Sequence, residues 1–211
     1  MSFDSPKGYF KFVLAMDCET TGLNKEHDDP SLGHQAVSWG IIVADAHTLL
    51  PIEKLYVEIK WNDESKRARK RDANFSVGAS AIHGLTYDYL EEHGISEQDA
   101  VEQIGYLILK YWGPDGHINA LAHNVNFDLS FFRAMFRRHG IELTFGSRQI
   151  DSNSAGFVML ESFTSDQFFS TMGMDERAHH NAMEDIEHTL ESCRRLRLIW
   201  NDSVGLNAHD W

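Results

Sequence analysis

Acidic and histidine side chains stand close together in three short stretches of this sequence. Asp17 and Glu19 follow the apolar run at residues 12–16, and side chains two apart on a strand project to the same face. Their Cβ atoms are then roughly 6.5 to 7 Å apart, so one divalent ion could bridge the two carboxylates. An isolated acid pair of this kind is more often a solvated strand end, and a metal site needs further ligands.

The other two stretches each supply one acid, and the later one also supplies a histidine. Asp128 falls in the first turn of a predicted helix that follows a short apolar strand, a junction where ligands bind in open α/β sheets. Asp185 lies at the edge of the apolar stripe of a later helix, and His180 stands at or before its start, roughly 7 Å away along the axis. Taken singly, Asp128 could instead complement a helix dipole, and His180 and Asp185 could be surface residues.

Together the three stretches supply four carboxylates and one imidazole, without a set of thiolate ligands. Such hard oxygen donors suit Mg²⁺ or Mn²⁺ rather than zinc. Two such ions about 4 Å apart stabilise the attacking and leaving oxygens of a phosphodiester and lower the pKa of a bound water. A histidine, which titrates near neutral pH, can then act as the general base.

Hydrophobic periodicity predicts the elements that position these residues. Strands are expected at 12–16, 36–43 and 55–61, with connections short enough for an antiparallel meander. A helix that starts near Ser96, with Asp99 in a capping pattern, runs to Trp112. A strand at 118–122, a helix at 127–139 and a strand at 143–150 follow, and helices dominate from 151 onward. The order predicts an α/β protein with a mixed sheet covered on both faces.

Composition bounds the class of protein. The 211 residues, 42% of them hydrophobic, can bury one good core, so a single domain over 1–211 is expected. No stretch approaches the roughly 20 apolar residues of a membrane span, and the N-terminal residues lack a signal-peptide pattern. Only two cysteines occur, Cys18 and Cys193, with no zinc-finger spacing. We therefore expect a soluble, cytoplasmic protein.

The net charge of −13 argues against broad electrostatic capture of a polyanion. Bound divalent cations would nevertheless reverse the sign of the field around a carboxylate cluster. One basic run departs from the acidic background and is either a solvated loop or a phosphate contact. It consists of Lys66, Arg67, Arg69, Lys70 and Arg71.

The three stretches, in this order, resemble the motifs of the DEDDh 3′→5′ exonucleases. The segments are Asp-Cys-Glu-Thr-Thr-Gly at 17–22, His-Asn-x-x-Phe-Asp at 123–128 and His-x-x-x-x-Asp at 180–185. Ile-His-Gly-Leu-Thr at 82–86 is similar to a further segment of that family. Each motif alone is weak or moderate, but the ordered set spans about residues 10–200. The resemblance implies a ribonuclease H-like fold with a five-stranded mixed sheet.

The resemblance also implies an activity, which is removal of 3′-terminal nucleotides as 5′-monophosphates from single-stranded DNA or RNA. Asp17 would bridge two Mg²⁺ or Mn²⁺ ions, Glu19 and Asp185 would complete the shell of the first, and Asp128 would hold the second. His180 would be the general base. The substrate contacts implied in the same way are Thr20, Gly22, Leu23, His83, Asn124 and Phe127.

Within the family, the length of the chain is most similar to that of ribonuclease T and of the exonuclease domain of the polymerase III epsilon subunit. The first of these likenesses implies a homodimer. The chain departs from the family in the second strand, where Ser38 takes the place of an acidic or amide residue.

Two other classes of function are open. A non-catalytic subunit could keep the fold and a metal-dependent hold on strand ends, although the presence of all five catalytic residue types disfavours it. A metal phosphohydrolase acting on small nucleotides is the other. The choice between RNA and DNA is also open, because recognition of the 2′-OH depends on details of the cleft.

Overall fold

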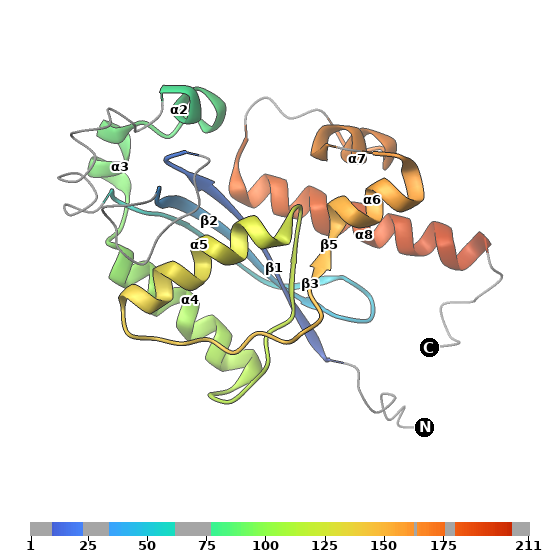
Figure 1. The fold of residues 1–211 in the computed structure, drawn as a ribbon, viewed down its shortest axis with the longest axis horizontal. Coiled ribbons are helices and arrows are strands. Elements are labelled where there is room, and N and C mark those ends of the chain that lie inside the picture. Colours follow the sequence, from blue (N-terminus) through green and yellow to red (C-terminus); the bar gives the residue numbers. More distant parts are fainter. Residues whose placement is uncertain (1–9, 23–33, 62–76, 163, 176–179, 204–211) are drawn as a thin grey trace.

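The computed structural model of the chain describes residues 10–22, 34–61, 77–162, 164–175 and 180–203, which form a five-stranded sheet with helices on both faces (Figure 1). The strand order is β3-β2-β1-β4-β5. β1, β2 and β3 pair antiparallel, whereas β4 and β5 run parallel to β1. The strands are β1 (Phe12–Thr20), β2 (Ala36–Asp45), β3 (Pro51–Glu58), β4 (Ala120–Ala122) and β5 (Ile150–Asp151).

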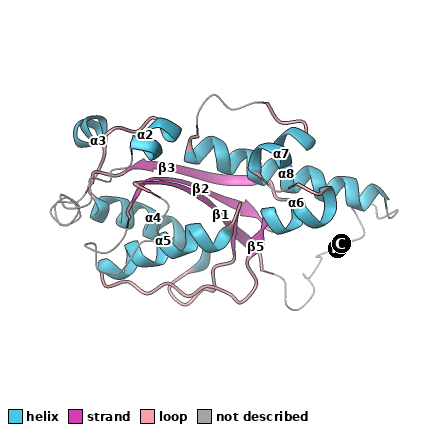
Figure 2. Cartoon of the chain, turned by 45° about the horizontal axis from the view of Figure 1, so that its top comes forward, coloured by secondary structure: helices cyan, strands magenta, loops and turns pink. Residues whose placement is uncertain are grey.

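Two helical layers enclose the sheet, and two short helices lie near its end (Figure 2). The helices are α2 (Val77–His83), α3 (Tyr87–His93), α4 (Glu97–Trp112), α5 (Val125–Arg138), α6 (Ser152–Leu160), α7 (Ser165–Thr171) and α8 (Ala182–Ser203). Among the described residues, no helix combines the length and the apolarity needed to cross a membrane.

The alternation of side chains along β1 divides the core into two parts. Leu14 and Met16 project toward α4 and α5, where they join a cluster that includes Trp39 and Phe132. Val13 and Ala15 project to the other face and pack with α8. β1 is therefore buried on both faces, which explains its nearly continuous apolar sequence.

Most of the predicted elements are confirmed. The first three strands form the expected antiparallel meander. α4 begins after Ser96, whose hydroxyl accepts the backbone N–H of Asp99 at 3.1 Å, as the capping pattern predicts. The predicted ribonuclease H-like arrangement, a mixed sheet covered on both faces, is also confirmed.

β1 continues through Thr20, so Asp17 and Glu19 lie on the strand, as their projection to one face requires. Two other details of the prediction differ from the structure. The strand expected at 143–150 is reduced to β5 and a single bridge at Phe145, because the side chain of Gln149 accepts the N–H of Ala120 where a ladder bond would otherwise form. α2 and α3 were not predicted, since seven-residue helices carry little periodic signal.

Candidate active site

β1 presents its two acids on the face of the sheet that α8 covers. Val13 and Ala15 pack with α8, whereas Cys18 belongs to the core on the opposite face. Asp17 and Glu19 continue the row of Val13 and Ala15, because side chains alternate along a strand. A β-bulge follows Glu19, at the point where the ladder with β2 shifts its register. The acid pair thus lies on one face, as its spacing predicts.

The start of α8 carries the second part of the site. Asn181 caps the helix, since its Oδ1 accepts the backbone N–H groups of Met183 at 3.0 Å and Glu184 at 3.2 Å. His180 precedes the cap and Asp185 lies in the first turn. Their side chains meet, with His180 Nδ1 3.2 Å from Asp185 Oδ2. The cap therefore fixes the spacing between the histidine and the acid.

A glycine on β2 lets α8 approach the sheet closely. Gly40 is the ladder partner of Asp17, so both residues face α8. A Cβ atom on Gly40 would lie 2.1 Å from the carbonyl oxygen of Ala182, the first residue of the helix. Only glycine fits this contact, and the contact places the first turn of α8 against the acidic end of β1.

These elements bring three ligand groups together. One ligand atom each from Glu19, His180 and Asp185 lie within 4.8 Å of one another. Two carboxylate oxygens and an imidazole nitrogen at this spacing fit a divalent cation. The three residues and Asp17 line a cavity of about 170 Å³. The other lining residues are Cys18, His123, Ser165, Phe169 and Thr189.

Asp128 reaches the same strand end from the opposite face of the sheet. β4 pairs with β1 only beside Leu14 and Ala15, so the N–H of Cys18 lies beyond the end of β4 and donates to Asp128 Oδ1 at 3.1 Å. Asp128 is buried and is not among the cavity-lining residues. Burial raises the pKa of its carboxyl group well above the ordinary value, and the bonds from Cys18 oppose that rise.

Cys18 shows that the carboxylates converge. Burial raises the pKa of its thiol well above the ordinary value, and the negative charges of Asp128, Asp17 and Glu19 raise it further. Three carboxyl groups therefore surround one side chain. The thiol stays protonated at neutral pH, which makes it a poor metal ligand.

His83 and its neighbour Ile82 connect the first and third motifs. The Nδ1 atom of His83 accepts the N–H of Leu85 at 3.0 Å, and its Nε2 lies 3.3 Å from the carbonyl oxygen of Thr20. Burial lowers the pKa of the ring, which is therefore neutral at pH 7. The carbonyl oxygen of Ile82 accepts the N–H of His180 at 3.3 Å. In this structure, His83 supports the backbone beside the cavity and does not line it.

The other predicted substrate-binding residues within the described part of the chain make contacts or turns inside the protein itself. Thr20 donates its hydroxyl to the carbonyl oxygen of Gly22 at 2.8 Å, and a Cβ on Gly22 would collide with the ring of His34. Asn124 adopts the left-handed conformation, with φ 67° and ψ 58°, in the turn before α5. Phe127 packs on the core cluster. Substrate contact by these four residues stays a prediction.

Two predicted features lie outside the described residues. They are Leu23 and the basic run from Lys66 to Arg71. Conversely, His123 lines the cavity although the motif comparison gave it no role. Its place as the first residue of the second motif, at the end of a strand, was a signal that the sequence did offer. Ser165, Phe169 and Thr189 carried no sequence signal. Tertiary packing alone brings α7 and the part of α8 around Thr189 to the cavity.

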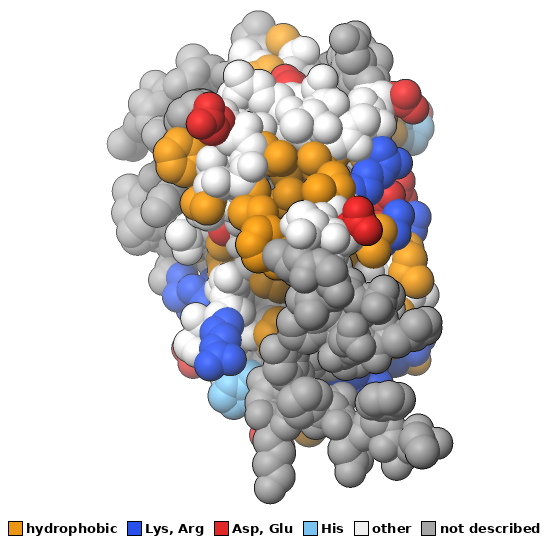
Figure 3. All heavy atoms as spheres, turned by 90° about the vertical axis from the view of Figure 1, so that its right-hand side faces the viewer, with side chains coloured by type: hydrophobic (Ala, Val, Ile, Leu, Met, Phe, Trp, Pro, Cys, Tyr) orange, Lys and Arg blue, Asp and Glu red, His pale blue; other side chains and the backbone are white. Residues whose placement is uncertain are grey.

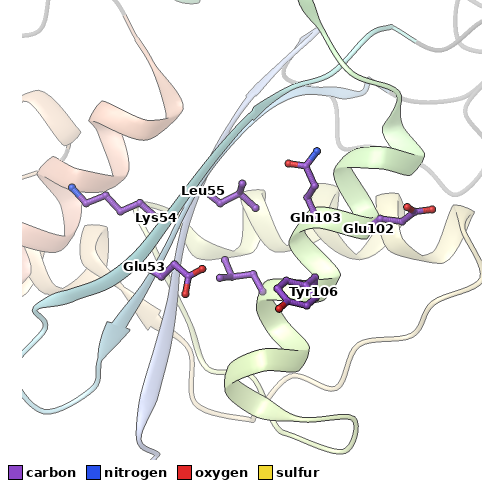
Figure 4. Close-up of a pocket in the computed structure, with 7 residues that line it drawn as sticks. Glu53, Lys54, Leu55, Glu102, Gln103 and Tyr106 are labelled. Atoms are coloured by element: carbon purple, nitrogen blue, oxygen red, sulfur yellow. The ribbon is translucent and has the colours of Figure 1, made fainter.

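A larger hollow of about 400 Å³ lies elsewhere, between β3 and α4 (Figure 4). Leu55, Gln103 and Tyr106 line it, together with the charged side chains of Glu53 and Glu102. Glu53 is engaged by Lys110 at 2.5 Å and by the hydroxyl of Tyr111 at 2.6 Å. The hollow contains none of the motif residues, so the smaller cavity at the end of β1 is the candidate active site.

Comparison with known proteins identifies relatives by structure. No protein-family model matches the chain, and no curated protein matches it by sequence. The nuclease domain of 3′hExo, a DEDDh family member solved with rAMP, matches with a TM-score of 0.66 and 13% identity over 96% of this chain and 98% of that one. A 3′-exonuclease solved for 3′-end-specific recognition of histone mRNA stem-loop matches at 0.65 and 13%, over 92% and 84%.

A zinc-bound complex of exonuclease I from E. coli with single-stranded DNA matches with a TM-score of 0.68 and 20% identity. The match covers 90% of this chain but only 41% of exonuclease I. At these identities the likeness establishes the fold: the chain has the ribonuclease H-like fold of DEDDh exonucleases. The fold and the site geometry together are the basis for assigning a function.

Proposed function

We propose that this protein is a metal-dependent 3′→5′ exonuclease that releases nucleoside 5′-monophosphates from single-stranded nucleic acid. One observation carries the proposal, which is the convergence of Glu19, His180 and Asp185 within 4.8 Å at the end of β1. The residues come from elements that are far apart in the sequence, on a fold shared with DEDDh exonucleases. A chance cluster of surface acids would not combine buried carboxylates with a histidine in this way.

The proposed cofactors are two Mg²⁺ or Mn²⁺ ions. Asp17, Glu19 and Asp185 would hold one ion, and Asp128, with Asp17, would hold the other. The buried states of Glu19, Asp128 and Asp185, at 8%, 2% and 5% exposure, support this, because buried carboxylates are retained where a cation or a donor compensates them. When bound, the ions would supply an activated water and neutralise charge on the phosphate.

His180 is the proposed general base. Its side chain is 45% exposed, so the ring is accessible to water, while Asp185 holds its Nδ1 at 3.2 Å. A carboxylate that accepts from one ring nitrogen orients the other and stabilises the imidazolium that forms. His180 would accept the proton of the attacking water and later release it to solvent.

The proposed substrate is a single-stranded 3′ end. The structural neighbours were solved with rAMP, with single-stranded DNA or for recognition of an RNA stem-loop, so they support nucleic acid without choosing between RNA and DNA. Terminal-nucleotide contacts by Thr20, Gly22, Leu23, His83, Asn124 and Phe127 remain part of the proposal. A cytoplasmic location is also retained as a proposal, supported by two free cysteines.

Hydrolysis of a 5′-labelled single strand tests the function. We expect stepwise shortening from the 3′ end in Mg²⁺ or Mn²⁺, no products in excess chelator, and no cleavage of a closed circle. Asp17→Asn should abolish turnover and leave the melting temperature near that of the wild type, because Asp17 is only partly buried. Binding without release of mononucleotides would indicate a non-catalytic subunit. Faster hydrolysis of a nucleoside triphosphate than of the oligonucleotide would indicate a small-nucleotide phosphohydrolase.

We also propose that two copies of the chain associate. The support is an apolar surface on the side of the molecule where α6 and the end of α8 lie (Figure 3). We call it the α6–α8 surface, and its exposed members are Phe157, Val158, Met159, Leu198, Ile199 and Trp200. α6 contains no charged residue and buries only Ser152 and Gly156. An apolar helix that a monomer leaves exposed is typical of an interface.

A further inference from the structure

The cavity contains a second histidine, which the proposed mechanism does not use. His123 directly follows β4, at the turn into α5. It lines the same cavity as Glu19, His180 and Asp185. A second imidazole inside a site for a polyanion raises the question of what it contacts.

The ring of His123 is held by contacts from two helices. Its Nδ1 lies 2.9 Å from the hydroxyl of Ser152, the fully buried first residue of α6. The ring stacks on Phe168, with centroids 6.3 Å apart and planes 25° apart, and lies 6.2 Å from the ring of Phe169. Both phenylalanines are buried. The orientation of the imidazole is therefore set before any substrate binds, as an effective binding group requires.

The backbone of the same turn is also anchored. Asn124 adopts its left-handed conformation there, and its N–H donates to Asp151 Oδ1 at 3.1 Å. The same oxygen accepts the N–H of Asn153 at 3.0 Å and so caps α6. The junction between β5 and α6 thus holds both the ring and the backbone of the turn that carries His123.

The size and charge of the cavity indicate what His123 meets. The volume of about 170 Å³ is smaller than the roughly 300 to 1,000 Å³ of pockets that enclose a small-molecule ligand. It suits a phosphate group and its ions rather than a whole nucleotide. Among the described lining residues there are three carboxylates and no lysine or arginine. Besides His180, the lining side chains with an imidazole or hydroxyl donor are His123, Ser165 and Thr189.

We propose that His123 binds the phosphate of the 3′-terminal linkage by donating a hydrogen bond from its imidazole to a non-bridging oxygen. The inference rests on the proposed exonuclease function and deepens it. The hydroxyl of Ser152 can donate to Nδ1, and in that arrangement the ring proton is on Nε2, the tautomer that this contact requires. His123 is thus a substrate-binding residue in the same cavity as the carboxylates.

A double-mutant cycle between protein and substrate tests the contact. His123→Phe keeps the aromatic packing against Phe168 and Phe169 and removes the donor, whereas His123→Gln keeps an N–H donor. Each variant is compared on two oligonucleotides, one normal and one with a neutral methylphosphonate at the 3′-terminal linkage. Binding is measured by fluorescence anisotropy with Ca²⁺ in place of Mg²⁺. His93→Phe is the matched control, because His93 is half-exposed at the end of α3.

We expect His123→Phe to weaken binding of the normal oligonucleotide about tenfold, which is typical of a hydrogen bond to a charged group. It should cause no further loss on the methylphosphonate, and KM should rise more than kcat falls. His123→Gln should stay within about threefold of wild type. Ser152→Ala, which removes only the hydroxyl that orients the ring, should give a smaller loss confined to the normal oligonucleotide.

Equal losses on both oligonucleotides, or wild-type binding by His123→Phe, would overturn the inference and leave His123 a packing residue. If His123→Phe does not fold, His123→Gln and Ser152→Ala are compared on the two oligonucleotides. A loss in Ser152→Ala that is confined to the normal oligonucleotide then supports the contact, and equal losses on both overturn it. The cycle is independent of turnover. A protein that binds 3′ ends through His123 but releases no mononucleotide would contradict the proposed exonuclease and retain the contact.

Discussion

His179 directly precedes His180 in the sequence and is the alternative candidate for the general base. Only His180 is within the described part of the chain, where its ring meets Asp185 at 3.2 Å. If His180 is the general base, His180→Ala should lower turnover by about 10² to 10⁴. His179→Ala should stay within a few-fold of wild type. Single-turnover rates at saturating Mn²⁺ compare the two variants. Equal losses, or a larger loss in His179→Ala, would show that His180 is not the general base.

The position of His180 within 4.8 Å of two carboxylates adds a competing role, since the ring could be a metal ligand. Calorimetric titration with Mn²⁺ separates the roles. A base leaves the metal affinity of His180→Ala close to that of wild type, whereas the loss of a ligand weakens it strongly. Asp185→Asn serves as the reference for a lost ligand.

At this scale the sequence predicts only part of the site. The i, i+2 spacing of Asp17 and Glu19 and the His180 to Asp185 interval rest on local geometry, so the structure brings these residues together as expected. The cavity position of Phe169 could not be predicted, because it depends on how α7 packs beside α8.

At the scale of elements, the contact between β2 and α8 leaves no room for a side chain at Gly40. Gly40→Ala would force a Cβ against the carbonyl oxygen of Ala182, so the start of α8 must shift. We expect a loss of about 1 to 3 kcal/mol in the free energy of unfolding and a more than tenfold fall in turnover. Chemical denaturation and the nuclease assay measure the two effects.

Gly105 provides the matched control. It lies within α4, and its nearest contact for a new Cβ is 3.8 Å away, at the ring of Phe136. Gly105→Ala should raise the free energy of unfolding by up to about 1 kcal/mol, because alanine is the better helix former, and should leave turnover unchanged. Wild-type turnover in Gly40→Ala would show that the close contact does not position the site.

α8 also carries a pH-dependent ion-pair cluster. Hydrogen bonds from Arg194 and then Arg195 lower the pKa of Glu191 from 4.5 to about 2. A carboxylate with a depressed folded-state pKa adds stability that is fully present above about 4.5 and is lost as pH falls toward 2. Glu191→Gln should therefore lower the melting temperature at pH 7 and converge with wild type in acid.

The size of this effect is limited by exposure. The Glu191 side chain is 29% exposed, so the contribution at pH 7 is about 1 kcal/mol or less, or roughly 2 to 4 °C. Scans of melting temperature against pH measure it, and 0.5 M NaCl should shrink the difference because salt screens partly exposed pairs. A constant difference from pH 7 to pH 3 would contradict the linkage.

The elements also differ in how well sequence periodicity predicts them. Long periodic segments such as α4, α5 and the β1–β2–β3 meander are confirmed, since their own residues specify them. β5 is short because Gln149 replaces a ladder bond with a side-chain bond, and α2 and α3 are each seven residues long. Contacts from elsewhere in the chain decide these elements.

At the scale of the whole molecule, charge and apolar surface oppose each other. The net charge of −13 repels a second copy, whereas the α6–α8 surface favours association. Its six members are each between 44% and 75% exposed and together present on the order of 500 Å², near the upper end for a monomer. A standard interface buries about 800 Å² per partner, so this surface and a polar rim suffice for a dimer.

Sedimentation equilibrium at tens of micromolar tests this association. We expect a dimer whose fraction increases between about 0.05 and 0.5 M NaCl, because salt screens the repulsion and leaves the apolar contact intact. Val158→Asp should give a monomer at every salt concentration, since Val158 is 75% exposed and a charge there disturbs only the contact with a partner. Leu50→Asp, 53% exposed between β2 and β3, is the control and should match wild type. A wild-type monomer in high salt, or a dimer that survives Val158→Asp, would show that the α6–α8 surface does not join two copies of this chain.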